Sequence, residues 1–103
     1  MKYVFVCKHG QHRSATCARI AHDIGLEKKF ELETDYVGIS ENESEEDKAN
    51  RLNEADRVFV MEENMRWHVK KVWHYYKEII CLNIEDREIE DKEIREKLLP
   101  YIK

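Results

Sequence analysis

The segment at residues 7–14 brings together a cysteine, an arginine and a serine, and it reads Cys-Lys-His-Gly-Gln-His-Arg-Ser. A cysteine thiolate is a strong nucleophile, and an arginine guanidinium can hold two oxygens of a tetrahedral anion through its planar fork. A serine hydroxyl can donate a hydrogen bond to the sulfur and ease its departure as a leaving group. The spacing of Cys7, Arg13 and Ser14 therefore favours nucleophilic chemistry at phosphorus.

The loop between Cys7 and Arg13 is suited to hold an anion. Backbone N–H groups of a short loop that enters a helix form a cradle for phosphate, and the positive end of the helix dipole adds to it. Three basic side chains in the loop favour the thiolate form of the cysteine, and a glycine relaxes the turn. The residues that we expect to bind substrate are Lys8, His9, Gly10, Gln11, His12 and Ser14.

The same cysteine–arginine spacing occurs a second time, between Cys81 and Arg87. That segment contains Glu85 and Asp86, whose negative charges would repel phosphate. It has no glycine, and no helix begins directly after its arginine. The basic neighbours and the strand–loop–helix pattern therefore select Cys7 as the nucleophile. The alternative for Cys7 is a small buried residue at the end of a strand.

Alternating patterns of apolar residues predict the elements that position this loop. Strands are expected at residues 2–7, 31–37, 57–61 and 78–82. Helices are expected from Ser14 to a stop at Gly25, from a cap at Ser44 to about Ala55, over residues 62–77, and from a cap at Asp91.

The order of these elements predicts an α/β domain of three layers, in which a four-stranded parallel sheet has helices on both faces. Ligands bind such a sheet beyond the carboxyl ends of its strands, where the loop after Cys7 lies. In the helix over residues 62–77, the apolar stripe is expected to contain Met65, Val69, Val72, Trp73 and Tyr76. Residues off the stripe, which we expect to be exposed, are Trp67, His68, His74 and Tyr75.

Length and composition limit the class of protein. The 103 residues predict one domain, 1–103, and 42% hydrophobic with 39% charged residues is typical of a globular chain. The net charge of −4 argues against general nucleic-acid binding. The longest apolar runs, residues 3–7 and 58–61, are too short for a membrane span. Three cysteines, an odd number, predict free thiols in a reducing cytoplasm rather than a disulfide framework.

Four segments together resemble the low-molecular-weight protein tyrosine phosphatases. They are Val-Cys-x5-Arg-Ser at 6–14, Asp-Tyr-Val-Gly at 35–38, Ala-Asp-Arg-Val-Phe-Val-Met-Glu at 55–62 and Ile-Cys-Leu-Asn-Ile-Glu-Asp at 80–86. The size and the last segment resemble a short prokaryotic branch of predicted tyrosine phosphatases. The resemblance implies a sheet in the order 2-1-3-4 and hydrolysis of phosphomonoesters without metal or other cofactor. The implied substrate is a phosphorylated protein or a small aryl phosphate, and we expect a monomer.

Hydrolysis also needs a carboxylic acid to protonate the leaving oxygen and then to activate water. In the family this acid lies in an Asp-Pro segment, and the matching position here is Asp86, followed by Arg87 and Glu88. Asp86 follows the last predicted strand, near the same end of the sheet as Cys7. Asp91 is the alternative, although it is better placed to cap the last helix.

Other interpretations of these residues stay open. Cys17 lies on the apolar stripe of the first helix, so we expect a packed thiol rather than a disulfide with Cys7. His9 and His12 could hold a metal with Cys7, but alternate loop positions around a phosphate cradle point outward instead of converging. An arsenate reductase would need cysteines that relay a disulfide, and Cys81 has no cysteine nearby in the sequence. A module that binds phosphate or a phosphopeptide without turnover is the remaining alternative.

Overall fold

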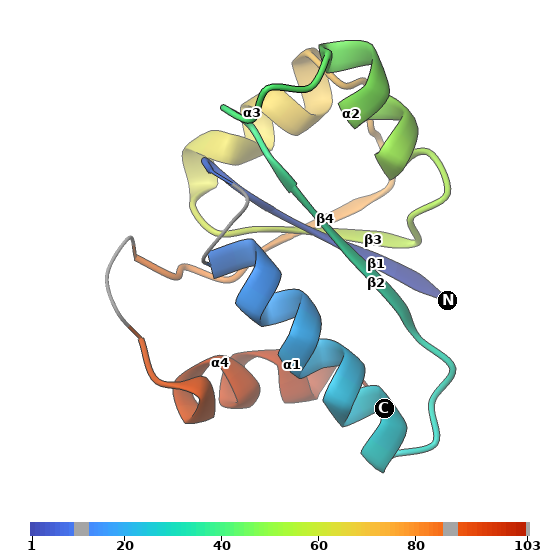
Figure 1. Ribbon diagram of the computed structural model, residues 1–103, viewed down its shortest axis with the longest axis vertical. Helices are drawn as coiled ribbons and strands as arrows, with labels where there is room; N and C mark the ends of the chain where they lie inside the picture. The colour runs from blue at the N-terminus through green and yellow to red at the C-terminus, as the bar shows by residue number, and fades with distance from the viewer. Residues whose placement is uncertain (10–12, 86–88, 103) are drawn as a thin grey trace.

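The computed structural model describes residues 1–9, 13–85 and 89–102. Strands and helices alternate along the chain (Figure 1). They are β1 (Lys2–Cys7), α1 (Arg13–Glu27), β2 (Glu33–Gly38), α2 (Glu45–Leu52), β3 (Arg57–Val60), α3 (Glu63–Lys71), β4 (Glu78–Cys81), α4 (Asp91–Leu98) and the 3-10 helix η1 (Leu99–Tyr101). The strands are parallel in the order β2-β1-β3-β4, which confirms the fold class and the strand order expected from the sequence.

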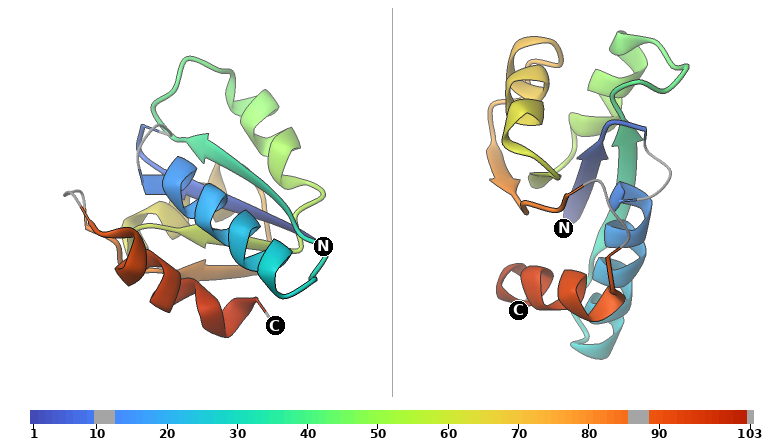
Figure 2. Two further views of the ribbon diagram at one scale, coloured as in Figure 1. Left: turned by 60° about the horizontal axis from the view of Figure 1, so that its bottom comes forward. Right: turned by 90° about the vertical axis from the view of Figure 1, so that its left-hand side faces the viewer.

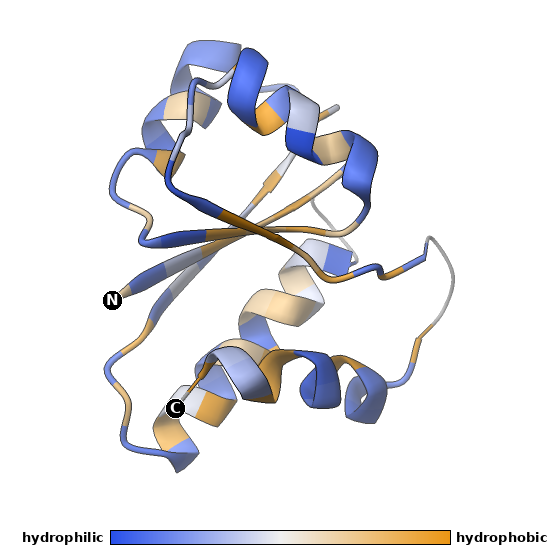
Figure 3. Cartoon of the chain, turned by 180° about the vertical axis from the view of Figure 1, so that it is seen from behind, coloured by the Kyte–Doolittle hydropathy of each residue, from blue (hydrophilic) through white to orange (hydrophobic). Residues whose placement is uncertain are grey.

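Two helices cover each face of the sheet: α1 and α4 lie on one side, and α2 and α3 on the other (Figures 1 and 2). Strand β1 pairs with both β2 and β3, so its residues from Tyr3 to Cys7 are buried by helices on both faces. The rings of Phe5 and Phe59 stack 4.9 Å apart in neighbouring strands. Figure 3 shows the hydrophobic colour on these strands and a mostly hydrophilic α2. No helix in the described ranges is both long and apolar enough to cross a bilayer.

Helix α1 continues to Glu27, although the sequence predicted a stop at Gly25. The left-handed residue that follows the helix is Lys29, with φ 54°, and the amide of Phe30 donates to the carbonyl of Gly25 at 2.9 Å. A Cβ on Gly25 would lie 3.2 Å from the Phe30 carbonyl oxygen and 3.3 Å from the Cβ of Leu32. The glycine is therefore needed for the close approach of the returning chain rather than as a C-cap.

Replacing Gly25 by alanine is expected to lower the free energy of unfolding by about 1 kcal/mol, because the cost of overpacking exceeds the gain in helix propensity. Urea unfolding followed by circular dichroism measures the change. His22→Ala on the exposed side of α1 is the control, with an expected change below about 0.5 kcal/mol. An unchanged or raised stability of Gly25→Ala would contradict the packing role.

Helix α3 ends at Lys71, so the predicted helix over residues 62–77 is too long. Beyond it, His74 has a left-handed backbone with φ 53°. Trp73 is 2% exposed and Tyr75 is 5% exposed, whereas Tyr76 is 71% exposed. Residues two apart on a helix point in nearly opposite directions, so an uninterrupted helix could not bury both Trp73 and Tyr75. The expected exposure of Tyr75 and burial of Tyr76 are therefore wrong.

Polar groups on the two buried rings fix this turn. The Nε1 of Trp73 donates to the Oε2 of Glu45 at 2.6 Å, and the hydroxyl of Tyr75 donates to the carbonyl of Ala55 at 2.9 Å. Helix α2 itself begins as predicted, since the Oγ of Ser44 accepts from the amide of Asp47 at 3.1 Å. It ends at Leu52, before the predicted end at about Ala55, and the chain then turns toward β3.

Candidate active site

The candidate nucleophile Cys7 is the last residue of β1, at the carboxyl end of one of the two interior strands. Cys7 is 3% exposed, and its Sγ lies 3.0 Å from the Oγ of Ser14. Ser14 is itself buried, in the first turn of α1. The hydroxyl can donate to the sulfur, so the structure brings together the two residues as the sequence predicted.

Helix α1 begins at Arg13, directly after the predicted anion-binding loop. Its first turn contains no acidic residue, so no carboxylate there offsets the positive end of the helix dipole. Lys8 and His9 are exposed at the start of the loop, where these side chains can meet an incoming anion. Four predicted site residues lie outside the described residues, and their roles stay predictions: Gly10, Gln11, His12 and Asp86.

The Arg13 side chain is 8% exposed and is held by two other elements. Its Nη1 donates to the Oε1 of Glu62 at 3.0 Å and to the carbonyl oxygen of Ile84 at 2.9 Å. Glu62 follows β3, and Ile84 follows β4. The two bonds fix the plane of the guanidinium, so an anion that binds it does not have to order this side chain first.

Sequence reasoning did not identify Glu62 and Ile84 as partners of Arg13. A usable signal existed for Glu62, because it follows a strand that is adjacent to β1 and so reaches the same end of the sheet. Ile84 acts through its backbone carbonyl, which no side-chain pattern reveals. The Glu62 side chain is 41% exposed, so solvent screens part of its negative charge.

The loop after β2 forms a wall beside Cys7. The amide of Ile39 donates to the carbonyl of Cys7 at 2.9 Å, and the amide of Ser40 donates to the carbonyl of Lys8 at 2.7 Å. From α2, the Nζ of Lys48 donates to the carbonyl of Ile39 at 2.7 Å, and Lys48 is 1% exposed. The buried ammonium of Lys48 thus anchors the wall, and the wall in turn anchors the first residues of the predicted anion-binding loop.

The other two cysteines are poorly suited to catalysis. Cys17 is buried on α1 with its Sγ 3.9 Å from the Sδ of Met61, and burial together with Cys7 raises the pKa of its thiol to about 12. The packed thiol expected for Cys17 is therefore present. Burial also raises the pKa of Cys81, on β4. Both thiols stay protonated at neutral pH, which disfavours the disulfide relay of an arsenate reductase.

The alternative acid Asp91 is bound elsewhere. Asp91 is the first residue of α4, and the N-cap position is occupied by Glu90, whose side chain makes no capping hydrogen bond. The predicted N-cap at Asp91 is therefore wrong. The Oδ2 of Asp91 accepts from the Nη2 of Arg19 at 3.0 Å, and both side chains are exposed. Arg19 lies about 9 Å further along α1 than Arg13, since each residue adds about 1.5 Å. This position favours Asp86 over Asp91 as the acid.

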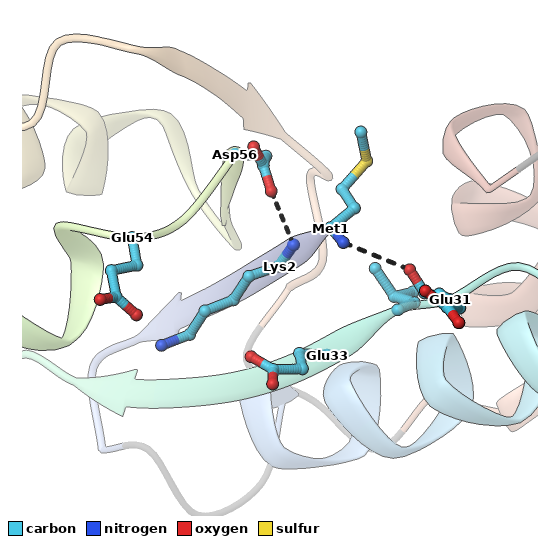
Figure 4. A pocket seen from close by; sticks show the side chains of 7 residues that line it. Met1, Lys2, Glu31, Glu33, Glu54 and Asp56 are labelled. Carbon is cyan, nitrogen blue, oxygen red and sulfur yellow. Dashed lines mark hydrogen bonds between the residues drawn. The ribbon is translucent and has the colours of Figure 1, made fainter.

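A groove of about 450 Å³ opens beside Arg13 and Lys8 and runs between the loop after β2 and α3. A second pocket, of about 590 Å³, lies at the opposite end of the strands (Figure 4). Its carboxylates, those of Glu31, Glu33, Glu54 and Asp56, would repel a phosphate. Among the residues that the structure describes, no group of three or more His, Cys, Asp or Glu is placed to hold a metal.

Comparison with known proteins rests on structure, since no family model and no curated protein matches the sequence. YfkJ from Bacillus subtilis has a TM-score of 0.69 at 17% identity, over 99% of this chain and 94% of that one. A low molecular weight protein tyrosine phosphatase from Bacillus subtilis has a TM-score of 0.69 at 12% identity, and the match covers 94% of this chain and 87% of that one. The third structure is a cysteine-to-serine mutant of the YwlE arginine phosphatase with a phosphorylated active-site serine. It has a TM-score of 0.66 at 11% identity, and the match covers 94% of this chain and 86% of that one. The chain shares the fold of these proteins.

Proposed function

We propose that this chain is a cysteine-dependent phosphomonoester hydrolase of the low-molecular-weight protein tyrosine phosphatase kind. The observation that carries the proposal is the buried pair of Cys7 Sγ and Ser14 Oγ, 3.0 Å apart, at the point where β1 leads into the start of α1. The anchored guanidinium of Arg13 at that helix start supports it. So does the fold, which is shared with a low molecular weight protein tyrosine phosphatase and with a phosphatase whose active-site serine carries phosphate.

In the first step the Cys7 thiolate attacks phosphorus in line with the leaving oxygen. The S–P bond forms, the P–O bond to the leaving group breaks, and Asp86 gives its proton to the departing oxygen. The guanidinium of Arg13, the loop backbone and the end of α1 stabilise the phosphoryl oxygens. Nη1 meanwhile keeps its bonds to Glu62 and Ile84.

In the second step water attacks the phosphocysteine. The Asp86 carboxylate accepts the proton of the water, the S–P bond breaks, and inorganic phosphate and the thiolate of Cys7 are released. The Ser14 hydroxyl stabilises the departing thiolate through the hydrogen bond to sulfur. The two steps need no metal, and both require Cys7 to be reduced, which agrees with a cytoplasmic location. We assign phosphotyrosine in proteins and small aryl phosphates as substrates, and a monomer as the working form.

Hydrolysis of p-nitrophenyl phosphate in mildly acidic to neutral buffer with a metal chelator tests the proposal. We expect turnover that inorganic phosphate inhibits competitively. Failure of the wild-type protein to turn over this substrate would refute the proposed hydrolase activity. Phosphate binding in the absence of turnover would instead identify the non-catalytic binding module.

Replacing Asp86 by asparagine is expected to slow the hydrolysis of phenyl phosphate by about 100-fold, because its basic leaving oxygen needs a proton donor. The loss should be smaller for p-nitrophenyl phosphate, whose leaving group departs readily without protonation. Inhibition by inorganic phosphate should persist in the variant. Asp91→Asn is the matched control, and a larger loss of activity in that variant would assign the role of general acid to Asp91 instead.

Glu62 offers a test of how Arg13 is held. Glu62→Gln keeps an oxygen that accepts from Nη1 but removes a negative charge near the phosphate, so inorganic phosphate should inhibit about 3-fold more tightly. Glu62→Ala removes the acceptor and should lower kcat by about 10-fold, since the guanidinium loses one of its anchors. Steady-state kinetics with phosphate as inhibitor distinguishes the two. Equal behaviour of the two variants would contradict a positioning role.

A further inference from the structure

The groove beside Arg13 has an exposed tryptophan on its wall. Trp67, on α3, is 63% exposed, whereas Trp73 a few residues later is 2% exposed. Asn64, Trp67 and His68 are three and four residues apart, so they present one face of the helix to the groove. A tryptophan ring that stands in a groove offers a large, rigid surface for stacking, and such rings are enriched among residues that dominate binding energy.

The wall that carries Trp67 is braced from α2. The Nε2 of His68 lies 3.0 Å from the Oε2 of Glu45, the same oxygen that accepts from Trp73, and the His68 and Trp73 rings pack edge to face at 4.8 Å. The Nζ of Lys48 lies 3.5 Å from the other carboxylate oxygen. Helices α2 and α3 are therefore tied together behind the groove, which keeps this wall in place.

The facing wall is fixed to the candidate cradle. Ile39 and Ser40 line the groove, and their amides donate to the carbonyls of Cys7 and Lys8. Lys8, which follows Cys7 directly in the chain, also lines the groove, together with Arg13 and its partner Glu62. Because this wall is bonded to Cys7 and Lys8, a molecule that binds in the groove lies close to the candidate nucleophile, and its phosphate would lie near Lys8 and Arg13.

Resting on the proposed phosphatase function, we infer that this groove binds the polypeptide on one side of the phosphorylated residue. Its volume of about 450 Å³ is that of a site for a small ligand or a few side chains. Trp67 and Met65 supply apolar contact, while Ser40 and Asn64 can hydrogen-bond main-chain amides. The preferred substrate is therefore a phosphorylated protein with an aromatic residue next to the phosphorylated side chain.

Two short phosphotyrosine peptides test this inference. They differ only in the residues on each side of the phosphotyrosine, which are phenylalanine in one and alanine in the other. For the wild-type protein we expect kcat/KM to be about 10-fold higher for the phenylalanine peptide, through a lower KM. Trp67→Ala should reduce this preference to less than about 2-fold. Tyr76→Ala, which removes an exposed ring away from the groove, should preserve it.

The outcomes separate the groove from the chemistry. If the protein hydrolyses p-nitrophenyl phosphate but shows no preference between the peptides, the proposed peptide binding in the groove is wrong and the proposed phosphatase activity is supported. A preference that survives in Trp67→Ala would also overturn the proposed peptide binding. If the protein hydrolyses no substrate, the proposed function fails, and calorimetric titration with the same peptides and variants decides whether the groove binds them.

Discussion

Replacing Cys7 by serine is expected to lower the turnover of p-nitrophenyl phosphate by about 10,000-fold or more, since a hydroxyl is a far weaker nucleophile than a thiolate. The substitution is nearly isosteric at a site that is 3% exposed, so the packing at the end of β1 should persist. A group at position 7 can still meet the Ser14 hydroxyl, and phosphate binding should therefore be retained. Kinetics and competition by inorganic phosphate measure the two properties separately.

The chain contains a matched control for this experiment. Cys81 is also the last residue of a strand and has an arginine at the same spacing, yet Cys81→Ser is expected to change turnover by less than about 2-fold. The Sγ of Cys81 lies 3.3 Å from the Oδ1 of Asn83, and the next helix among the described residues, α4, begins only at Asp91. Turnover that survives in Cys7→Ser, or disappears in Cys81→Ser, would contradict the assignment of the nucleophile.

The strands are the part of the fold that the sequence predicts best. A parallel strand inside the sheet is covered by helices on both faces, and residues 3–7 accordingly form an unbroken apolar run. Each predicted strand overlaps an observed one, with ends that differ by at most two residues. The order 2-1-3-4 is not contained in these runs, since it depends on which strands meet. It was implied by the resemblance, and the structure confirms it.

Helix ends are predicted less well, because contacts distant in sequence decide them. Gly25 has the residue type of a C-cap, but the space it leaves is taken up by the chain that returns toward β2. The apolar stripe favours burial of Tyr76, yet a hydrogen bond to the Ala55 carbonyl buries Tyr75 instead. Asp91 has the residue type of an N-cap, but its carboxylate pairs with Arg19 on α1. In each of these cases a tertiary contact overrides the preference that the local sequence indicates.

The candidate site divides in the same way. Cys7 and Ser14 are seven residues apart in one strand–loop–helix unit, so their contact follows from local structure. Two partners of Arg13 among the described residues, Glu62 and Ile84, are 49 and 71 residues away, and the sheet order brings them to it. Lys48 is a charged residue on a mostly hydrophilic helix, yet it is buried and its Nζ donates to the carbonyl of Ile39 in the wall beside Cys7. Local patterns thus predict the candidate reactive groups, and the residues that hold these groups become visible only in the fold.

Replacing Arg13 by lysine is expected to lower kcat/KM by roughly 1,000-fold although the charge is unchanged, because a preorganised donor set stabilises the transferring phosphoryl group. The Nη1 of Arg13 donates to both Glu62 and the Ile84 carbonyl, and in our proposal the guanidinium also binds phosphate. An ammonium is a single point of charge, so it can meet Glu62 or the phosphate but not both sets of acceptors. Inhibition by inorganic phosphate should weaken in parallel with kcat/KM.

A second arginine on α1 separates the geometry of Arg13 from a general effect of the substitution. Arg19 is 57% exposed and pairs with Asp91, so Arg19→Lys should keep kcat/KM within about 2-fold of the wild-type value. Urea unfolding of Arg13→Lys would reveal any loss of stability from the orphaned Ile84 carbonyl, for which we expect about 1–2 kcal/mol. A variant that unfolds at a lower urea concentration but keeps the phosphate inhibition constant of the wild type would make Arg13 a structural anchor only. Weaker phosphate inhibition in a folded Arg13→Lys protein is the result that places the anion on the fork of this guanidinium.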